Sequence, residues 1–331
     1  MVVANLRDSL AELNWVRNLT DQGRFAEVIG WLRDREPDAI TGSPTLALCC
    51  GIAHGRLGHH DQAARWVDTV LSYTGDRPLH TRALNVRGAI ALETGRLDEA
   101  SDYFVRALAG AKAQGALGTL GRCCNNLGIV ANLRGQHLDA VSWYTLALAA
   151  FQRAGWAQGI AETENDLRIT YRDLGQLDYA LESADRAVYA AEGTGNLSLL
   201  ASAIAGRAEI RALRGEPQIA DREIHRALMI HRDQEDVMGE AEDLRVLALT
   251  TAALGDLDRA ERTYREAIEQ AEVHHRPALG AEAGRDLALL LAEQGRYDEA
   301  RDVARAARVW FSQLGAEAQV RRLDALLEGW A

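Results

Sequence analysis

A short phrase that begins with glycine recurs along the whole chain at a nearly constant interval. It reads GRLDEA at 95–100, GQLDYA at 175–180 and GDLDRA at 255–260. The leading glycines are Gly23, Gly58, Gly95, Gly135, Gly175, Gly215, Gly255 and Gly295. Their separations are 35 and 37 residues, and then 40 residues five times in succession. Self-similarity at such a period predicts one structural unit stacked on copies of itself, rather than a set of unlike domains.

Small residues hold fixed places on either side of each glycine. Five residues after it, alanine stands in seven of the eight copies, and seven residues before it most copies have glycine or alanine, with Arg168 an exception. Larger apolar residues follow at helical spacing, so each unit is predicted to form two amphipathic helices that approach closely. The glycine between them suits the left-handed residue that ends the first helix. One such hairpin cannot bury its own apolar face, so neighbouring copies must stack.

The composition argues against several classes of protein. The formal net charge of −11 speaks against a nucleic-acid partner, which usually requires a basic surface. The only lysine is Lys112, which excludes a phosphate-binding loop and a convincing Schiff-base site. No apolar run approaches the ~20 residues that cross a bilayer, and residues 1–15 lack the apolar segment of a secretory signal. We therefore expect a cytoplasmic protein with no nucleic-acid and no membrane partner.

No pattern of catalytic or metal-binding residues is found. The four cysteines form two adjacent pairs, Cys49 with Cys50 and Cys123 with Cys124, and no C-x-x-C spacing occurs. Buried apolar cysteines are the favoured interpretation, and a redox pair is the alternative. The histidines show no metal-binding spacing, and no nucleophile motif is present. The sequence predicts no enzyme, no metal site and no cofactor.

The order of small residue, glycine, alanine, aromatic residue and alanine resembles the tetratricopeptide repeat. The resemblance covers nearly the whole chain, and the 40-residue unit is similar to the longer variety of kinesin light chains and of bacterial peptide sensors and signalling regulators. It implies an all-α fold, a right-handed superhelical solenoid of about eight helical hairpins. We expect residues 1–331 to form a single array. Residues 315–331 (GAEAQVRRLDALLEGWA) are predicted to form one more amphipathic helix that caps the last apolar face.

The resemblance also implies where a ligand binds, because in tetratricopeptide arrays the first helix of each hairpin lines the concave face. Ten residues before successive turn glycines the sequence places Asn85, Asn125 and Asn165, and further on Arg245 and Arg285. Similar repeats use asparagines at this place to hold a bound peptide backbone. The chemistry suits that role, since an amide offers one acceptor and two donors and can pair with both halves of a peptide unit.

Other positions of the first helices complete the predicted groove. Six residues before the glycine stand mostly apolar residues such as Ile129 and Ile169, with Glu209 interrupting the series. Thirteen residues before it stand Arg82 and Arg122. The residues predicted to bind a peptide or protein are Arg82, Asn85, Arg122, Asn125, Ile129, Asn165, Ile169, Arg245 and Arg285.

Two alternatives stay open for these polar side chains. They can form a ligand groove, or they can simply solvate an exposed wall of the array. Arg245 and Arg285 can hold a ligand carboxylate in a bidentate fashion, or they can pair internally with acidic neighbours such as Glu242 and Glu282.

The leading functional hypothesis is a non-enzymatic scaffold that binds a peptide or an extended protein segment in its concave groove. The alternative is a ligand-sensing regulatory module of a bacterial signalling or transcription-control system. No helix-turn-helix motif and no phosphate-binding loop is found, so such a module is expected to act in trans. Neither hypothesis fixes an oligomeric state.

Overall fold

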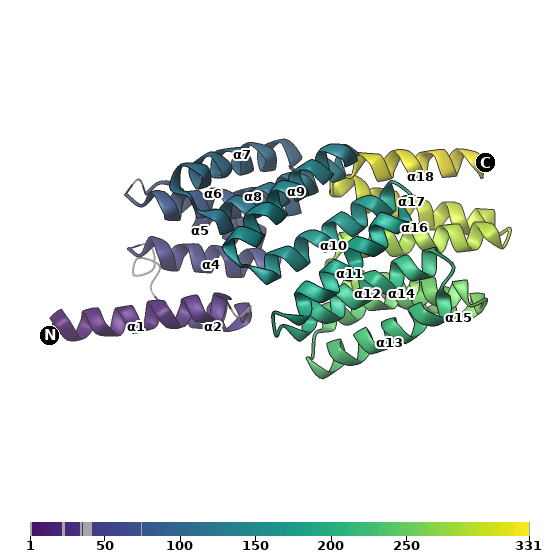
Figure 1. Ribbon diagram of the computed structural model, residues 1–331, viewed down its shortest axis with the longest axis horizontal. Helices are drawn as coiled ribbons and strands as arrows, with labels where there is room; N and C mark the ends of the chain where they lie inside the picture. The colour runs from purple at the N-terminus through teal and green to yellow at the C-terminus, as the bar shows by residue number, and fades with distance from the viewer. Residues whose placement is uncertain (1, 22–23, 34, 36–41, 74, 331) are drawn as a thin grey trace. The chain divides into compact units, whose positions relative to one another are not determined.

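The computed structural model describes residues 2–21, 24–33, 35, 42–73 and 75–330, with side chains from residue 11 onward except for residue 21. Across these residues all regular structure is helical, with seventeen helices and no strand (Figure 1). Sixteen of the helices follow one another as eight hairpins, and the last stands alone, so the predicted all-α repeat fold with a terminal helix is confirmed. The chain divides into two compact units, Met1–Cys123 and Cys124–Ala331, and the boundary falls within helix α8 (Leu117–Leu133).

Unit 1 holds three hairpins and the first part of α8. Its helices are α1 (Val2–Asp21), α2 (Phe25–Arg33), α4 (Pro44–Arg56), α5 (His60–Leu71), α6 (Arg77–Glu93) and α7 (Leu97–Gln114). The small residues predicted at the helix contacts are needed there. A Cβ added to Gly88 would lie 2.6 Å from the ring of Phe104, and one added to Gly51 would lie 2.7 Å from Val67. Only glycine therefore lets these pairs of helices come as close as they do.

Unit 2 contains the remaining hairpins and the terminal helix. Its helices after α8 are α9 (His137–Ala154), α10 (Ala157–Asp173), α11 (Leu177–Glu192), α12 (Leu197–Leu213), α13 (Pro217–Asp233), α14 (Val237–Ala253), α15 (Leu257–Val273), α16 (Pro277–Glu293), α17 (Tyr297–Gln313) and α18 (Glu317–Gly329). The first helices α10, α12, α14 and α16 contact one another in succession, and α11, α13 and α15 each contact the first helix that follows. This is the contact pattern of stacked helical hairpins.

The predicted turn glycines adopt the left-handed conformation in every described copy. Their φ angles lie between 72° and 93° at Gly58, Gly95, Gly135, Gly175, Gly215, Gly255 and Gly295. Gly23, the first of the series, lies outside the described residues. The interval between the glycines thus marks the turn inside each hairpin.

A second series of left-handed residues marks the turns between hairpins, with the same 40-residue period. It consists of Gly115, Gly155, Gly195, Glu235, His275 and Gly315. Glu235 and His275 adopt φ angles of 54° and 53°, where a side chain crowds the backbone. The structure accepts this strain at two of the six turns.

Helix α18 covers the end of unit 2, as expected for a cap. Leu323 on α18 is fully buried in a cluster that includes Phe311 and Ala316, and Trp330 packs against the same cluster. The helix also reaches the early part of unit 2. Its Gln319 side chain donates a hydrogen bond to the Asp173 carboxylate (3.1 Å), and Leu133 packs against the cluster around Leu323. The terminal helix therefore joins hairpins that lie far apart in the sequence.

All four cysteines are buried free thiols, as the favoured interpretation predicted. Burial and, to a smaller extent, the neighbouring Cys49 raise the pKa of the Cys50 thiol to about 12. A thiol that is neutral over the physiological range is a poor nucleophile. These cysteines act as small apolar residues of the core.

Candidate functional site

The first helices of unit 2 bring a set of charged side chains together where α10, α12, α14 and α16 meet. We call this set the charge network. Its members are Arg168, Arg172, Asp173, Glu209, Arg245, Glu282, Arg285 and Asp286. It contains four arginines and four carboxylates, so its formal charges balance.

Glu209 on α12 is the centre of the charge network. Its side chain is only 2% exposed, and three arginines from two other helices donate to it. Arg172 Nη1 and Arg245 Nη2 each lie 2.7 Å from Glu209 Oε1, and Arg168 donates to Oε2. A buried carboxylate with three guanidinium partners has its acceptor capacity largely filled.

The charge network continues from this centre to α16. Arg172 Nη2 lies 2.9 Å from Glu282 Oε1, which joins residues 110 positions apart in the sequence. Arg245 Nη1 donates to Asp286 Oδ2 at 2.8 Å, and Arg285 Nη2 donates to Asp286 Oδ1 at 2.7 Å. Pairing across so many helices fixes the first helices relative to one another.

The arginines govern how the buried carboxylates ionise. Burial alone would raise the pKa of Glu209, but the charges of Arg172, Arg245 and Arg168 hold it well below its ordinary value. Against the same effect of burial, Arg172, Arg245 and Arg285 lower the pKa of Glu282 to about 2. Both carboxylates are therefore ionised at neutral pH. Burying so many charges costs free energy that an apolar core would not, and such groups are often retained for function.

The predicted asparagines of unit 2 border the charge network. Asn125 Nδ2 donates to Asp166 Oδ2 at 2.8 Å, and Asn165 Oδ1 accepts from Arg168 Nε at 3.0 Å. Burial raises the pKa of Asp166 to about 7, although the hydrogen bond from Asn125 lowers it. Both asparagines are half-buried and each has a side-chain partner. Asp166 is thus a carboxyl group that changes charge near neutral pH.

The other predicted residues of unit 2 differ in how much surface they offer. Ile129 and Ile169 are both half-buried, and Ile129 packs against the cluster of Tyr144 and Leu167. Arg245 is buried and Arg285 is half-buried, and both pair internally within the charge network. Internal pairing, one of the two alternatives for these arginines, is therefore what the structure shows. A ligand carboxylate at this place would compete with Asp286.

Three predicted residues belong to unit 1. Arg82 on α6 and Arg122 on α8 are exposed, and Asn85 on α6 is half-buried. The thiol of Cys123 donates to Asn85 Oδ1 at 3.5 Å. Asn85 thus resembles the asparagines of unit 2 in having an internal partner.

The sequence did contain a signal for the charge network. Arg168 is the exception to the small residues before the turn glycine, and Glu209 is the exception in the apolar series. The structure shows that these two exceptions are paired with each other. A charged residue that breaks a repeat pattern at a buried position needs a partner, and a second break in a neighbouring repeat is the natural candidate.

Metal sites and membrane-spanning helices are both absent from the described residues. These residues contain no cluster of histidine, cysteine, aspartate and glutamate that could hold a metal ion. Within the same part of the chain, every helix is too short or too polar to cross a membrane.

Comparison with known proteins identifies the repeat. The family model of the tetratricopeptide repeat matches residues 51–116 and 246–327. The chain thus contains tetratricopeptide repeats, and the resemblance seen in the sequence is confirmed. A search of curated protein sequences finds no match.

Solved structures of similar fold include several bacterial regulators. The Rap conjugation gene regulator of plasmid pLS20, in complex with the Phr* peptide, has a TM-score of 0.68 at 14% identity, over 84% of this chain and 74% of that one. A Rap protein complexed with competence and sporulation factor has a TM-score of 0.62 at 14% identity, over 98% and 97%. NprR with its cognate peptide NprX has a TM-score of 0.58 at 17% identity, over 90% and 85%. At these identities the likeness shows a shared fold.

Proposed function

We propose that this protein is a non-enzymatic scaffold that binds a peptide or an extended segment of another protein on the first helices of its repeats. The observation that carries the proposal is the charge network, which includes two of the predicted contact residues, Arg245 and Arg285, and which Asn125 and Asn165 border. Proteins of the same fold were solved with the peptides Phr* and NprX bound. The proposed partner is a protein or peptide of the cytoplasm. The net charge of −11 disfavours nucleic acid as a partner.

In unit 2 the proposed contacts divide by chemistry. The half-buried Ile129 and Ile169 supply apolar surface, and the amides of Asn125 and Asn165 supply hydrogen bonds to a peptide backbone. A bound peptide would replace Asp166 as the hydrogen-bond partner of the Asn125 amide. Such an exchange costs little, because a carboxyl group of pKa about 7 is easily neutralised.

The arginines of unit 2 would recognise an acidic group. Arg285 pairs with Asp286 and keeps some exposed surface, so a ligand carboxylate can compete with Asp286 for its guanidinium group. Arg245 is held by Glu209 and Asp286 and would act mainly by positioning Arg285 and Asp286. On unit 1 we propose that Arg82 and Arg122 contact a ligand and that the amide of Asn85 pairs with a peptide backbone.

The test is a selection from a phage-displayed library of random peptides, followed by affinity measurement on purified protein. An Asn125→Ala/Asn165→Ala double variant is expected to lose at least tenfold in affinity for the selected peptides. The matched control is Gln152→Ala/Gln313→Ala, which removes two exposed amides from second helices and should bind like the wild type. Equal binding by the double variant and the wild type would show that this face is not the site.

A second candidate function is a ligand-sensing regulatory module that acts in trans. Helix α18 favours it, because Arg322 donates to the Asp173 carbonyl at 2.7 Å and Gln319 donates to the Asp173 carboxylate. Asp173 also belongs to the charge network, so a ligand that disturbs the network can act on the terminal helix. A change in the X-ray scattering profile on adding a selected peptide would favour the sensor. An unchanged profile with the peptide bound would favour a passive scaffold.

A further inference from the structure

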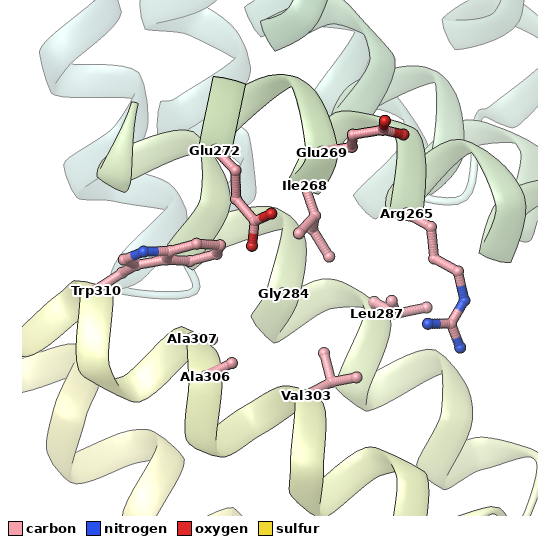
Figure 2. A pocket seen from close by; sticks show the side chains of 10 residues that line it. All are labelled: Arg265, Ile268, Glu269, Glu272, Gly284, Leu287, Val303, Ala306, Ala307 and Trp310. Atoms are coloured by element: carbon pink, nitrogen blue, oxygen red, sulfur yellow. The ribbon is translucent and has the colours of Figure 1, made fainter. Parts of the chain in front are cut away.

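A separate cavity of about 290 Å³ lies among α15, α16 and α17 in unit 2 (Figure 2). Its walls include Ile268, Glu272, Gly284, Leu287, Val303 and Trp310. No member of the charge network lines it, so it is distinct from the proposed peptide site. Its volume lies at the lower end of the range for ligand pockets, ~300–1,000 Å³.

One wall of the cavity carries a residue that departs from most other repeats. Gly284 stands eleven residues before its turn glycine; one earlier repeat has Ala47 there, and five have larger side chains. They are Leu84, Cys124, Glu164, Ile204 and Leu244, and all five are buried. A Cβ added to Gly284 would lie 3.0 Å from that of Ala307, so α16 and α17 approach closely beside the cavity.

A second glycine of α16 places the aromatic wall. A Cβ added to Gly280 would lie 2.5 Å from the ring of Trp310, so the indole rests directly against the helix. In the earlier repeats Glu240, Leu200 and Ile160 stand at the position of Gly280. Gly284 thus lines the cavity, and Gly280 lets the indole ring lie against α16 beside it.

The mouth of the cavity is acidic. Glu272 extends its carboxylate between Trp310 and Ile268, and Glu269 stands on the same rim (Figure 2). Among the described residues, neither carboxylate forms a hydrogen bond or an ion pair. Arg265, the nearby cation, already pairs with Glu261 at 2.8 Å. An apolar cavity therefore opens beside an indole ring and carboxylates that lack a cation.

We propose that this cavity binds a small organic ammonium ion. The alkyl part lies in the cavity between Leu287 and Val303, and the cationic nitrogen lies between the Glu272 carboxylate and the Trp310 ring. An aromatic face and a carboxylate both attract a cation, and an ammonium with alkyl substituents is less costly to desolvate than a metal ion or an ammonium without them. A ligand of choline's size suits the volume. The site is independent of the proposed peptide-binding face.

The test compares choline with its neutral isostere 3,3-dimethylbutan-1-ol by ligand-observed NMR titration of the full chain. Choline is expected to bind about tenfold more tightly, since a cation over an indole and beside a carboxylate gains ~1–2 kcal/mol. Equal affinity for the two compounds, or no binding of choline, would overturn the proposal.

Variants locate the site. Glu272→Gln should weaken choline about fivefold and leave the neutral alcohol unchanged, whereas Trp310→Leu should remove the preference for the cation. Ala306→Leu fills the cavity and should abolish binding of both, because Leu146 shows that a leucine is tolerated at the equivalent place. The control is Glu266→Gln, an exposed carboxylate of α15 outside the lining, which should bind choline like the wild type. Loss of binding in Glu266→Gln equal to that in Glu272→Gln would also contradict the site.

Discussion

The first helices of unit 2 carry two buried faces of opposite chemistry. One face packs on the second helix of the same hairpin with small and apolar residues, as where Gly128 receives the ring of Tyr144 only sixteen positions away. The other face carries the charge network, whose pairs between different helices join residues 36 to 110 positions apart. The two faces therefore have different roles. Local apolar contacts build each hairpin, and charge pairs between distant residues fix the hairpins relative to one another.

The largest expected effect comes from breaking the charge network at its centre. In Glu209→Gln, three arginines lose the buried carboxylate that they share, so we expect unit 2 to lose about 3–5 kcal/mol of unfolding free energy. Denaturant unfolding measures it. The control is Glu182→Gln, which breaks an exposed pair with Arg186 and should change stability by less than ~0.5 kcal/mol. Equal stabilities of the two variants would mean that the network does not hold the helices.

The next largest effect on stability is expected from a substitution on the apolar face. Leu287→Ala removes a fully buried side chain from the core, and the transfer and cavity terms together predict a loss of about 2–4 kcal/mol. Unlike the loss in Glu209→Gln, this one should be nearly independent of salt and pH, since no charge is involved. A loss that changes markedly with salt would show that the two faces are coupled and not separate.

Asp166, which borders the charge network, is expected to make the stability of the fold depend on pH. The pKa of Asp166 in the folded protein is about 7, above the 3.8 of an exposed aspartate, so its proton stabilises the fold fully below pH 3.8. That contribution is lost as pH rises through 7, and the wild type should be about 2 kcal/mol less stable at pH 8 than at pH 5. Asp166→Asn should remove this part of the pH dependence. Parallel stability curves for variant and wild type would refute the assignment.

The smallest effect concerns the turns between hairpins. Glu235→Gly and His275→Gly should each stabilise the protein by roughly 0.5–1 kcal/mol, because glycine adopts a positive φ without crowding. The opposite change, Gly155→Ala, should lose a similar amount, since its added Cβ meets no atom within 4 Å and tests the backbone alone. Thermal unfolding measures all three. Destabilisation by both glycine variants would show that these side chains do more than strain the turn.

The sequence predicted the features that a single repeat determines. The interval between turn glycines and the small residues around them encode the hairpin locally, so helices, turns and terminal helix could be inferred without a structure. The pairing of Arg168 with Glu209 could not, although both were visible as exceptions, because it depends on how one repeat is placed on the next. The asparagines show the same limit: their position was predictable, but not the partners Asp166 and Arg168.

The cavity beside Gly284 could not be predicted from the sequence. From the sequence, a glycine within a helix predicts only a lower helix propensity. Its place in the wall of a cavity becomes visible only in the structure, where the equivalent residues of other repeats are buried. The left-handed conformation of Glu235 was likewise not predicted, since glutamate seldom adopts a positive φ.

The proposed function requires that a peptide binds where the first helices of unit 2 meet. Hydrogen exchange with and without a peptide selected from the library tests it most directly, because it reports which backbone segments a ligand protects. We predict slower exchange in the unit 2 part of α8 and in α10, α12, α14 and α16, with Asn125→Ala/Asn165→Ala abolishing the change. Protection confined to the second helices, or no protection with the peptide bound, would contradict the claim.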